Sequence, residues 1–384
     1  MLGRLILLPL LMMAVAAYSN NMMIPSPPAI AAKSYILMDA DTGAVIAERD
    51  ADIQLDPASL TKVMTAYVAD YEVEQGNISL DDVTTVSKQA WAKNFQGSSL
   101  MFLEVGKKVK VVDLMKGVII SSGNDASVAL AEHTAGNVGA FVDLMNQHAK
   151  HLGMTNTHFE NVHGLTSKNH LTTARDLAKL AQSAIKSFPE RYKFYSEKSY
   201  TYNGIKQYNR NRLLWRDPSV DGMKTGHTDK AGYCLIASAK RDDMRLIAVV
   251  LGAKSEESRA KEAQKLFSYG FRYYETVKVY EKGQVAKEVK IWGGEKPKVA
   301  LIPSKDIFVT VPKSQVEDLE AQVSVNKYLE APIEKGDILA ELILKAEGKV
   351  LSKTPLIAKD AVDEGSFFKR FWAKIKLFFV KLIG

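Results

Sequence analysis

The tetrapeptide Ser59-Leu60-Thr61-Lys62 places a hydroxyl and an amine three residues apart, on one face of any helix that contains them. The preceding Asp56-Pro57 predicts that a helix begins here, with Pro57 in its first turn. A serine needs a nearby base before it can attack an acyl carbon, and a lysine can be that base only when burial or a neighbouring cation lowers its pKa. The stretch therefore predicts a nucleophile, Ser59, beside its base, Lys62.

Two further motifs follow along the chain, Ser122-Gly123-Asn124 and Lys224-Thr225-Gly226. Ser122 could relay a proton to a leaving group, and Asn124 could fix a substrate amide. Lys224 could act as a second cation that lowers the pKa of Lys62 and attracts a substrate carboxylate. Each motif alone is a weak signal, but the ordered set of three is typical of acyl transfer through a serine ester.

Hydrophobic patterning places these motifs on elements. Apolar runs at 35–38 and 44–47 flank Asp41-Thr42-Gly43 and predict a hairpin. Helices are expected after Ser59, with Val63, Met64, Tyr67 and Val68 as the core face, and at 112–119 and 126–134. Lys224-Thr225-Gly226 precedes two apolar strands, 233–238 and 244–251, which predict an antiparallel pair beside the active cleft. Thr225 and Gly226 on an edge strand would let a substrate peptide pair with backbone groups.

Together with six longer stretches, these motifs resemble the low-molecular-mass penicillin-binding proteins of the type-5 group, which are D-alanyl-D-alanine carboxypeptidases. The stretches are residues 35–39, 97–103, 121–126, 157–159, 163–165 and 221–233. The likeness runs from about Lys33 to the end of the chain. It implies an α+β fold of the β-lactamase and transpeptidase type, with a mainly antiparallel sheet flanked by helices. A small all-β domain and a C-terminal amphipathic helix would follow.

The resemblance also implies roles for single residues. Ser59 forms the acyl-enzyme, Lys62 is the general base, and Ser122 and Asn124 assist proton transfer and substrate placement. Lys224, Thr225 and Gly226 line the cleft, and the backbone N–H groups of Ser59 and His227 form the oxyanion hole.

Other residues have less defined roles. Arg210 and Arg259 match family arginines near the cleft and are candidates to bind a terminal carboxylate, although both also fit as surface residues. His227 is expected to position the substrate, and His163 and Asp176 are expected to be structural. Cys234 is expected to be a buried small hydrophobe.

The implied reaction removes the terminal D-alanine from a peptidoglycan pentapeptide that ends in D-Ala-D-Ala, and β-lactams would trap Ser59 as a slow ester. Three alternatives stay open: a β-lactamase, an endopeptidase of the same fold that cuts crosslinks, and a penicillin-binding scaffold of low turnover that shapes the cell wall. The absence of a Glu-x-x-x-Asn segment between Asn124 and Lys224 argues against a class A β-lactamase.

Composition limits which classes of binding partner and cofactor are expected. The net charge of +7 would suit nucleic acid or an anionic membrane, and the lack of a nucleic-acid module favours the membrane. One cysteine and no His-Glu-x-x-His motif argue against a zinc site, and no cofactor is expected. Assembly of identical subunits stays open.

The two ends of the chain predict export and membrane attachment. Arg4 and the apolar run 5–17, which is too short to span a bilayer, indicate a signal peptide over residues 1–19. A peptidase domain at 33–274 and a β-rich domain at 275–362 would follow, the latter as a spacer or a partner-binding module. Residues 365–384 form an amphipathic helix with aromatic residues on one arc and cations on the other. We expect 366–384 to lie on the anionic periplasmic face of the inner membrane rather than to pack on the protein's own core.

Overall fold

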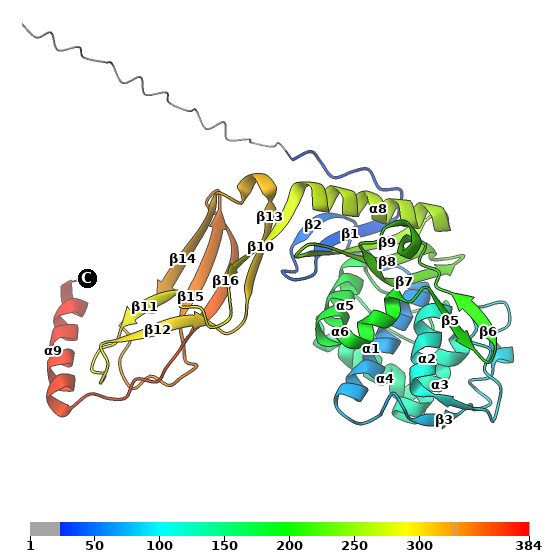
Figure 1. Cartoon of the computed structure of the whole chain (residues 1–384), viewed down its shortest axis with the longest axis horizontal. Coiled ribbons are helices and arrows are strands. Elements are labelled where there is room, and N and C mark those ends of the chain that lie inside the picture. Colours follow the sequence, from blue (N-terminus) through cyan, green and yellow to red (C-terminus); the bar gives the residue numbers. More distant parts are fainter. Residues whose placement is uncertain (1–23, 326–327, 384) are drawn as a thin grey trace, which may run out of the picture.

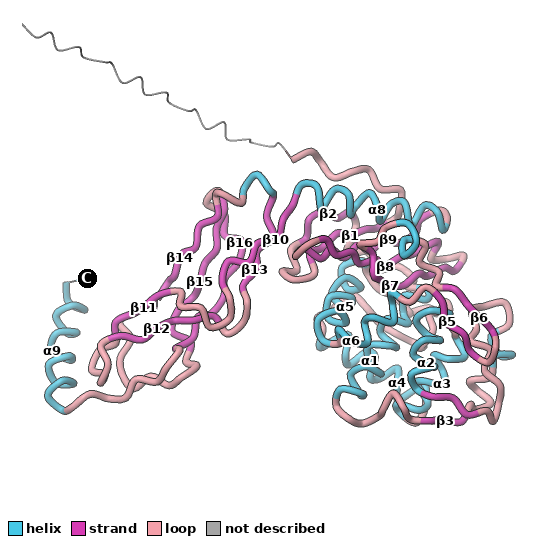
Figure 2. Tube along the Cα trace, in the orientation of Figure 1, coloured by secondary structure: helices cyan, strands magenta, loops and turns pink. Residues whose placement is uncertain are grey.

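The computed structural model describes residues 24–325 and 328–383 of the 384-residue chain. Within these parts Figure 1 and Figure 2 show a larger body of helices and sheet, a smaller β-rich body and a separate C-terminal helix. This is the fold class that the sequence predicts. The expected signal peptide, residues 1–19, lies outside the described residues.

An antiparallel five-stranded sheet in the order β2-β1-β9-β8-β7 forms the centre of the larger body. Its strands are β1 (Ser34–Asp39), β2 (Val45–Arg49), β7 (Val220–Thr228), β8 (Gly232–Arg241) and β9 (Met244–Ala253). The predicted hairpin is β1–β2, and the predicted strand pair is β8–β9. The Lys224 motif lies on β7, at the free edge of the sheet.

Helices cover both faces of this sheet, because alternate residues of its strands are apolar on each side. Leu246, Ala248 and Val250 pack with α8 (Glu256–Tyr273), whereas Ile247 and Val249 pack with the main group of helices. The helices of that group and its neighbourhood are α1 (Thr61–Glu74), α2 (Val111–Lys116), α3 (Asn124–Ala135), α4 (Val138–His151), α5 (Ala174–Ser187), α6 (Pro189–Tyr192) and α7 (Leu213–Arg216). Two small hairpins complete the body, β3 (Val83–Thr85) with β4 (Lys108–Lys110) and β5 (Ser199–Tyr202) with β6 (Ile205–Tyr208).

Helix α1 is buried more completely than the four predicted core residues require. Val63, Met64, Tyr67 and Val68 are buried as predicted, but every residue from 61 to 70 is also buried. The predicted core face is therefore confirmed, and burial extends beyond it to the whole stretch 61–70. Lys62 consequently lies inside the protein.

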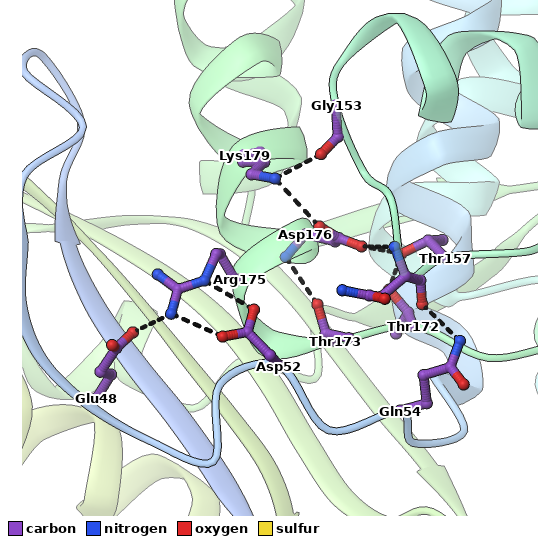
Figure 3. Close-up of polar contacts among 11 residues, drawn as sticks. Glu48, Asp52, Gln54, Gly153, Thr157, Thr172, Thr173, Arg175, Asp176 and Lys179 are labelled. Carbon is purple, nitrogen blue, oxygen red and sulfur yellow. Dashed lines mark hydrogen bonds and ion pairs between the residues drawn. The ribbon is translucent and has the colours of Figure 1, made fainter.

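The N-terminus of α5 is fixed by polar contacts, which Figure 3 shows. Thr173 accepts a hydrogen bond from the backbone N–H of Asp176 at 3.1 Å and so caps the helix. The buried Asp176 carboxylate accepts from Thr157 Oγ1 at 2.9 Å, and Arg175 pairs with Glu48 and Asp52. Asp176 thus joins α5 to neighbouring loops and does not reach the cleft described below.

The β-rich body contains two sheets and its own apolar core. One sheet pairs β10 (Tyr274–Tyr280) with β13 (Ile307–Pro312). The other has the order β11-β12-β16-β15-β14, with strands β11 (Lys287–Lys290), β12 (Lys298–Pro303), β14 (Leu319–Val325), β15 (Ile338–Ala346) and β16 (Lys349–Ala358).

The two bodies are joined directly, since α8 ends at Tyr273 and β10 begins at Tyr274. A polar cluster reinforces this connection. The fully buried carboxylate of Asp39 accepts hydrogen bonds from Thr42 Oγ1 at 2.8 Å and from Thr276 Oγ1 at 2.7 Å. Thr310 Oγ1 lies 2.6 Å from the Thr42 hydroxyl. The turn between β1 and β2 is therefore hydrogen-bonded to both β10 and β13.

Helix α9 (Phe367–Ile383) lies against the end of the β-rich body. Leu377 is buried there, and Arg370 and Lys381 pair with Glu364 and Glu330. The outward side carries exposed Phe367, Phe368, Phe371, Trp372, Phe378, Phe379 and Leu382. Of the described residues, none belongs to a helix that is both long and apolar enough to cross a bilayer.

Candidate active site

Ser59 lies in a 3₁₀ turn, Ala58–Leu60, which leads directly into α1. Lys62, one turn later, points its amine back toward Ser59, and Lys62 Nζ lies 3.1 Å from Ser59 Oγ. Ser59 is half-buried and Lys62 is buried. The spacing of the opening tetrapeptide therefore brings the two side chains within hydrogen-bond distance.

The environment of Lys62 favours its neutral amine. Burial, with a smaller contribution from the charge of Arg210, lowers the pKa of Lys62 to about 7, so that much of this lysine is neutral near neutral pH. Its amine also contacts Asn124 Oδ1 at 2.7 Å and the carbonyl oxygen of His163 at 2.6 Å. These two acceptors hold the amine in place beside Ser59.

We expected Lys224 to lower the pKa of Lys62, but burial and Arg210 are the main causes. Lys224 is itself buried, and burial, followed by repulsion from Lys62, holds the pKa of Lys224 well below its ordinary value. Lys224 Nζ donates to Ser122 Oγ at 2.9 Å and to the carbonyl of Thr225 at 3.1 Å. The site therefore contains two buried amines.

The second motif lies between a π-helical turn, Gly117–Ser121, and α3. Ser122 adopts a left-handed conformation with φ 60°, which ends the turn and directs the chain into α3. Asn124 begins that helix, and its Nδ2 donates to Ser98 Oγ at 2.8 Å while its Oδ1 accepts from Lys62. The side-chain amide of Asn124 thus connects Lys62 to the loop that carries Ser98.

Edge strand β7 passes close to the turn that carries Ser59, at Gly226. A Cβ at this position would lie 3.1 Å from each of Ala58 Cβ, Pro57 O and Ser59 N, which is tighter than ordinary packing. Glycine therefore permits the strand to approach the turn. On the opposite side of the motif, the carbonyl of Gly226 accepts from the buried Arg259 at 3.1 Å.

Several of these residues line a cleft of about 390 Å³, behind which Lys62, Asn124 and Lys224 are buried. Its lining is mainly polar and consists of Ser59, Gly97, Ser98, Ser99, Ser122, Arg210, Thr225, Gly226, His227, Tyr233, Glu256 and Arg259. The His227 ring stacks on Tyr233 with centroids 4.0 Å apart, and Arg259 lies over the same tyrosine at 5.6 Å. The cleft thus combines the Ser59 hydroxyl, two arginine cations and the backbone of an edge strand.

The structure places all ten predicted site residues in or against this cleft, whereas Cys234 is buried on β8. Sequence reasoning missed Ser98, Glu256 and the carbonyl of His163. Residues 97–103 were noted only for their resemblance, and no local spacing connects Ser98 to Asn124. His163 was expected to be structural, and burial does lower the pKa of its ring to about 3, so the ring is neutral. The backbone carbonyl of His163 nevertheless accepts a hydrogen bond from Lys62.

Comparisons with known proteins identify the family of this chain. Residues 21–255 match the family model of D-alanyl-D-alanine carboxypeptidases, and residues 274–364 match that of the C-terminal domain of penicillin-binding protein 5. The Escherichia coli K12 D-alanyl-D-alanine carboxypeptidase DacA is 42% identical over 378 residues, covering 96% of this chain and 94% of the relative.

Solved structures show the same likeness. Penicillin-binding protein 5 of Haemophilus influenzae is 43% identical with a TM-score of 0.85, covering 88% of this chain and 100% of that one. Penicillin-binding protein D2 of Listeria monocytogenes in its ampicillin-bound form is 31% identical with a TM-score of 0.58, covering 64% of this chain and 100% of that one.

Proposed function

Because the chain belongs to the D-alanyl-D-alanine carboxypeptidase family and is a serine peptidase of that type, we propose that Ser59 is its nucleophile and Lys62 its general base. The observation that carries this assignment is the 3.1 Å contact between Lys62 Nζ and Ser59 Oγ. It joins a hydroxyl that borders the cleft to a buried amine whose pKa is lowered to about 7.

In the first half of the reaction, Lys62 takes the proton of Ser59 Oγ, which attacks the carbonyl carbon of the penultimate D-alanine. The backbone N–H groups of Ser59 and His227 stabilise the negative oxygen. When the C–N bond breaks, the proton held by Lys62 passes through the Ser122 hydroxyl, which Lys224 contacts at 2.9 Å, to the leaving D-alanine nitrogen, and Lys62 is neutral again. In the second half, water attacks the ester and Lys62 accepts its proton.

The cations of the cleft suit a substrate with a free carboxylate. Arg210 is exposed at the cleft, whereas Arg259 is buried and already bonded to Gly226 O. We assign Arg210, together with the Thr225 hydroxyl, to direct contact with the terminal carboxylate. Arg259 supports β7, and Asn124 fixes the substrate amide next to Lys62.

β-Lactams are expected to acylate the same serine. The ampicillin-bound relative supports this, since it shares the fold of the catalytic body. The strained amide would take the place of the D-Ala-D-Ala bond, and Ser59 Oγ would form a slowly hydrolysed ester.

The test is the release of D-alanine from a synthetic pentapeptide ending in D-Ala-D-Ala, with Ser59→Ala as the matched variant. Wild type should release D-alanine and bind a fluorescent penicillin covalently, whereas the variant should do neither. Equal release by both proteins would overturn the Ser59 assignment. Labelling without release would favour the scaffold, and preferential release from a crosslinked dimer would favour an endopeptidase.

Localisation is a further part of the proposal. We place the protein at the outer face of the cytoplasmic membrane, exported by residues 1–19, with a peptidase domain at 33–274 and a β-rich domain at 275–362 as spacer. The exposed aromatic side of α9 supports attachment through residues 366–384. Lys369 donates to Glu295 O, and Arg370 and Lys381 pair with glutamates, so Lys374 and Lys376 are the helix cations best placed for anionic lipids.

A further inference from the structure

A buried histidine that the reaction does not contact, His170, is connected to the nucleophile by a chain of hydrogen bonds. His170 Nδ1 accepts from the backbone N–H of Glu160 at 2.9 Å, and His170 Nε2 lies 2.8 Å from Thr61 Oγ1. Thr61 Oγ1 in turn donates to the carbonyl oxygen of Ala58 at 2.9 Å. His170, Thr61 and Ala58 are all buried, so water does not compete for these bonds.

The donors and acceptors in this chain of hydrogen bonds can be assigned in only one direction, from His170 to Ala58. A backbone N–H can only donate, so Nδ1 of His170 must be unprotonated and Nε2 must carry the hydrogen. The Thr61 hydroxyl then accepts from Nε2–H and uses its own hydrogen for Ala58 O. Burial lowers the pKa of His170 to about 4, which agrees with a neutral ring.

The chain of hydrogen bonds ends at the peptide bond between Ala58 and Ser59. Ala58 O and the N–H of Ser59 belong to the same planar group and point in opposite directions. Two glycines mark these directions. A Cβ on Gly164 would lie 1.8 Å from Ala58 O, whereas a Cβ on Gly226, in the cleft strand, would lie 3.1 Å from Ser59 N. Fixing the carbonyl on the inner side therefore aims the N–H at the cleft.

This peptide needs such support, because Ala58 has φ 48°, in the left-handed region that a residue with a Cβ rarely adopts. The backbone N–H of Thr61 also bonds to Ala58 O, but it belongs to the same short turn. The bond from His170 comes from a different segment, more than 100 residues away in sequence. It ties the turn to the rest of the protein.

We propose that His170 is a positioning residue that acts through Thr61 on the Ala58–Ser59 peptide and so aims the Ser59 N–H at the oxyanion of the transition state. This inference rests on the proposed roles of Ser59 and its N–H. It assigns no contact between His170 and substrate.

Two pairs of substitutions test these hydrogen bonds, one pair at Thr61 and one at His170. Thr61→Val removes the hydroxyl while keeping the shape, and Thr61→Ser retains it. His170→Leu removes the donor, and His170→Gln retains an N–H near the position of Nε2. Titration of Ser59 with a fluorescent penicillin counts the reactive sites in each preparation, so that kcat for D-alanine release is expressed per folded site.

Thr61→Val and His170→Leu should each lower kcat per titrated site by about tenfold to a hundredfold, with KM changed by less than about threefold, because oxyanion contacts act mainly in the transition state. Thr61→Ser and His170→Gln should recover most of this loss. The preference for an ester over its thiono analogue should also fall, since sulfur gains less from an aligned N–H donor.

Unchanged kcat per titrated site in both Thr61→Val and His170→Leu, with only fewer sites or a lower Tm, would overturn the inference and leave His170 a purely structural role. Equal losses for ester and thionoester would also overturn it. These results differ from a failure of the proposed function, which would appear as activity in Ser59→Ala.

Discussion

Lys62 shows how a single residue depends on its surroundings for its chemistry. An exposed lysine has a pKa near 10.4 and is not a base at neutral pH. Inside α1, burial removes the hydration of the cation, and Arg210 adds repulsion across the cleft. Asn124 Oδ1 and His163 O retain the amine in the position from which it can take the Ser59 proton.

The rate of acylation should therefore depend on the charge of Lys62. Only the neutral amine accepts a proton, so kcat/KM should rise with pH through about 7 and fall below it. Arg210→Gln should move this acid limb to higher pH, because loss of a nearby cation raises the pKa of Lys62. The measurement is kcat/KM for the pentapeptide between pH 5 and 9.

Arg210→Lys is the matched control, since it keeps the charge and should keep the position of the limb even if the amplitude falls. A flat profile between pH 6 and 8 in the wild type would contradict the assignment of Lys62 as base. An unchanged limb in Arg210→Gln would contradict the influence of Arg210 on that pKa.

At the scale of elements, the site is assembled where a turn, a helix start and an edge strand meet. The 3₁₀ turn presents Ser59, the start of α3 presents Asn124, and β7 presents Lys224. Each element is held by contacts outside the cleft. The same sheet also holds the β-rich body, because the turn between β1 and β2 carries the cluster around Asp39.

Thr276→Val should weaken this connection without affecting catalysis. The buried Asp39 carboxylate would lose the 2.7 Å bond from Thr276 Oγ1, and a hydrogen bond to such a group contributes about 1.5–3 kcal/mol. We expect the free energy of unfolding to fall by about this amount, as measured by chemical denaturation, with kcat unchanged.

Thr276→Ser retains the hydroxyl and serves as the control. If valine and serine at this position gave the same stability, the bond from β10 to Asp39 would contribute nothing to the joint. Limited proteolysis near residue 274 would report whether the connection between the bodies has loosened.

At the scale of the whole molecule, the catalytic body, the β-rich body and α9 form a row in Figure 1. Helix α9 packs on the β-rich body through Leu377 and leaves its aromatic side exposed. Gly293 lies in a loop that faces this helix. A Cβ added to Gly293 would lie 3.8–4.0 Å from atoms of Arg370 and Ala373, which is ordinary van der Waals contact, so the loop lies close to the helix. The helix thus has one side that packs on the protein and another, exposed side that we propose contacts a lipid surface.

Deletion of 366–384 should release the protein from anionic vesicles and leave kcat unchanged, since α9 is remote from the cleft. Within the full chain, Phe371→Ser should weaken vesicle binding by at least about tenfold, because it removes apolar area from the lipid side. Co-sedimentation of the form without residues 1–19 measures both effects.

Leu377→Ala is the matched variant on the docked side and should weaken vesicle binding much less than Phe371→Ser. Continued sedimentation of the truncated protein with vesicles would contradict attachment through α9. Equal losses for the two substitutions would contradict the division of the helix into two sides.

Some of this protein can be predicted from the sequence because local spacing encodes local geometry. The apolar strands after Lys224 and the aromatic arc of residues 367–382 each predicted the element that the structure contains. The three-residue step from Ser59 to Lys62 predicted that the two side chains meet, although Ser59 lies in the 3₁₀ turn that precedes α1 and not in the helix itself. The overall fold class followed from the resemblance that these motifs carry. The four predicted core residues of α1 are buried, but periodicity did not show that the residues between them are buried as well.

Only the tertiary structure decided the contacts between distant segments. The bond from Asn124 to Ser98, the His163 carbonyl on Lys62, the Arg210 charge and the chain from His170 to Ala58 join segments with no shared periodicity. Every residue has a backbone carbonyl with the same chemistry. The residue type at position 163 therefore does not indicate that its carbonyl contacts Lys62. The sequence by itself thus determined which groups could react, and folding determined which of them are buried, aimed and in contact.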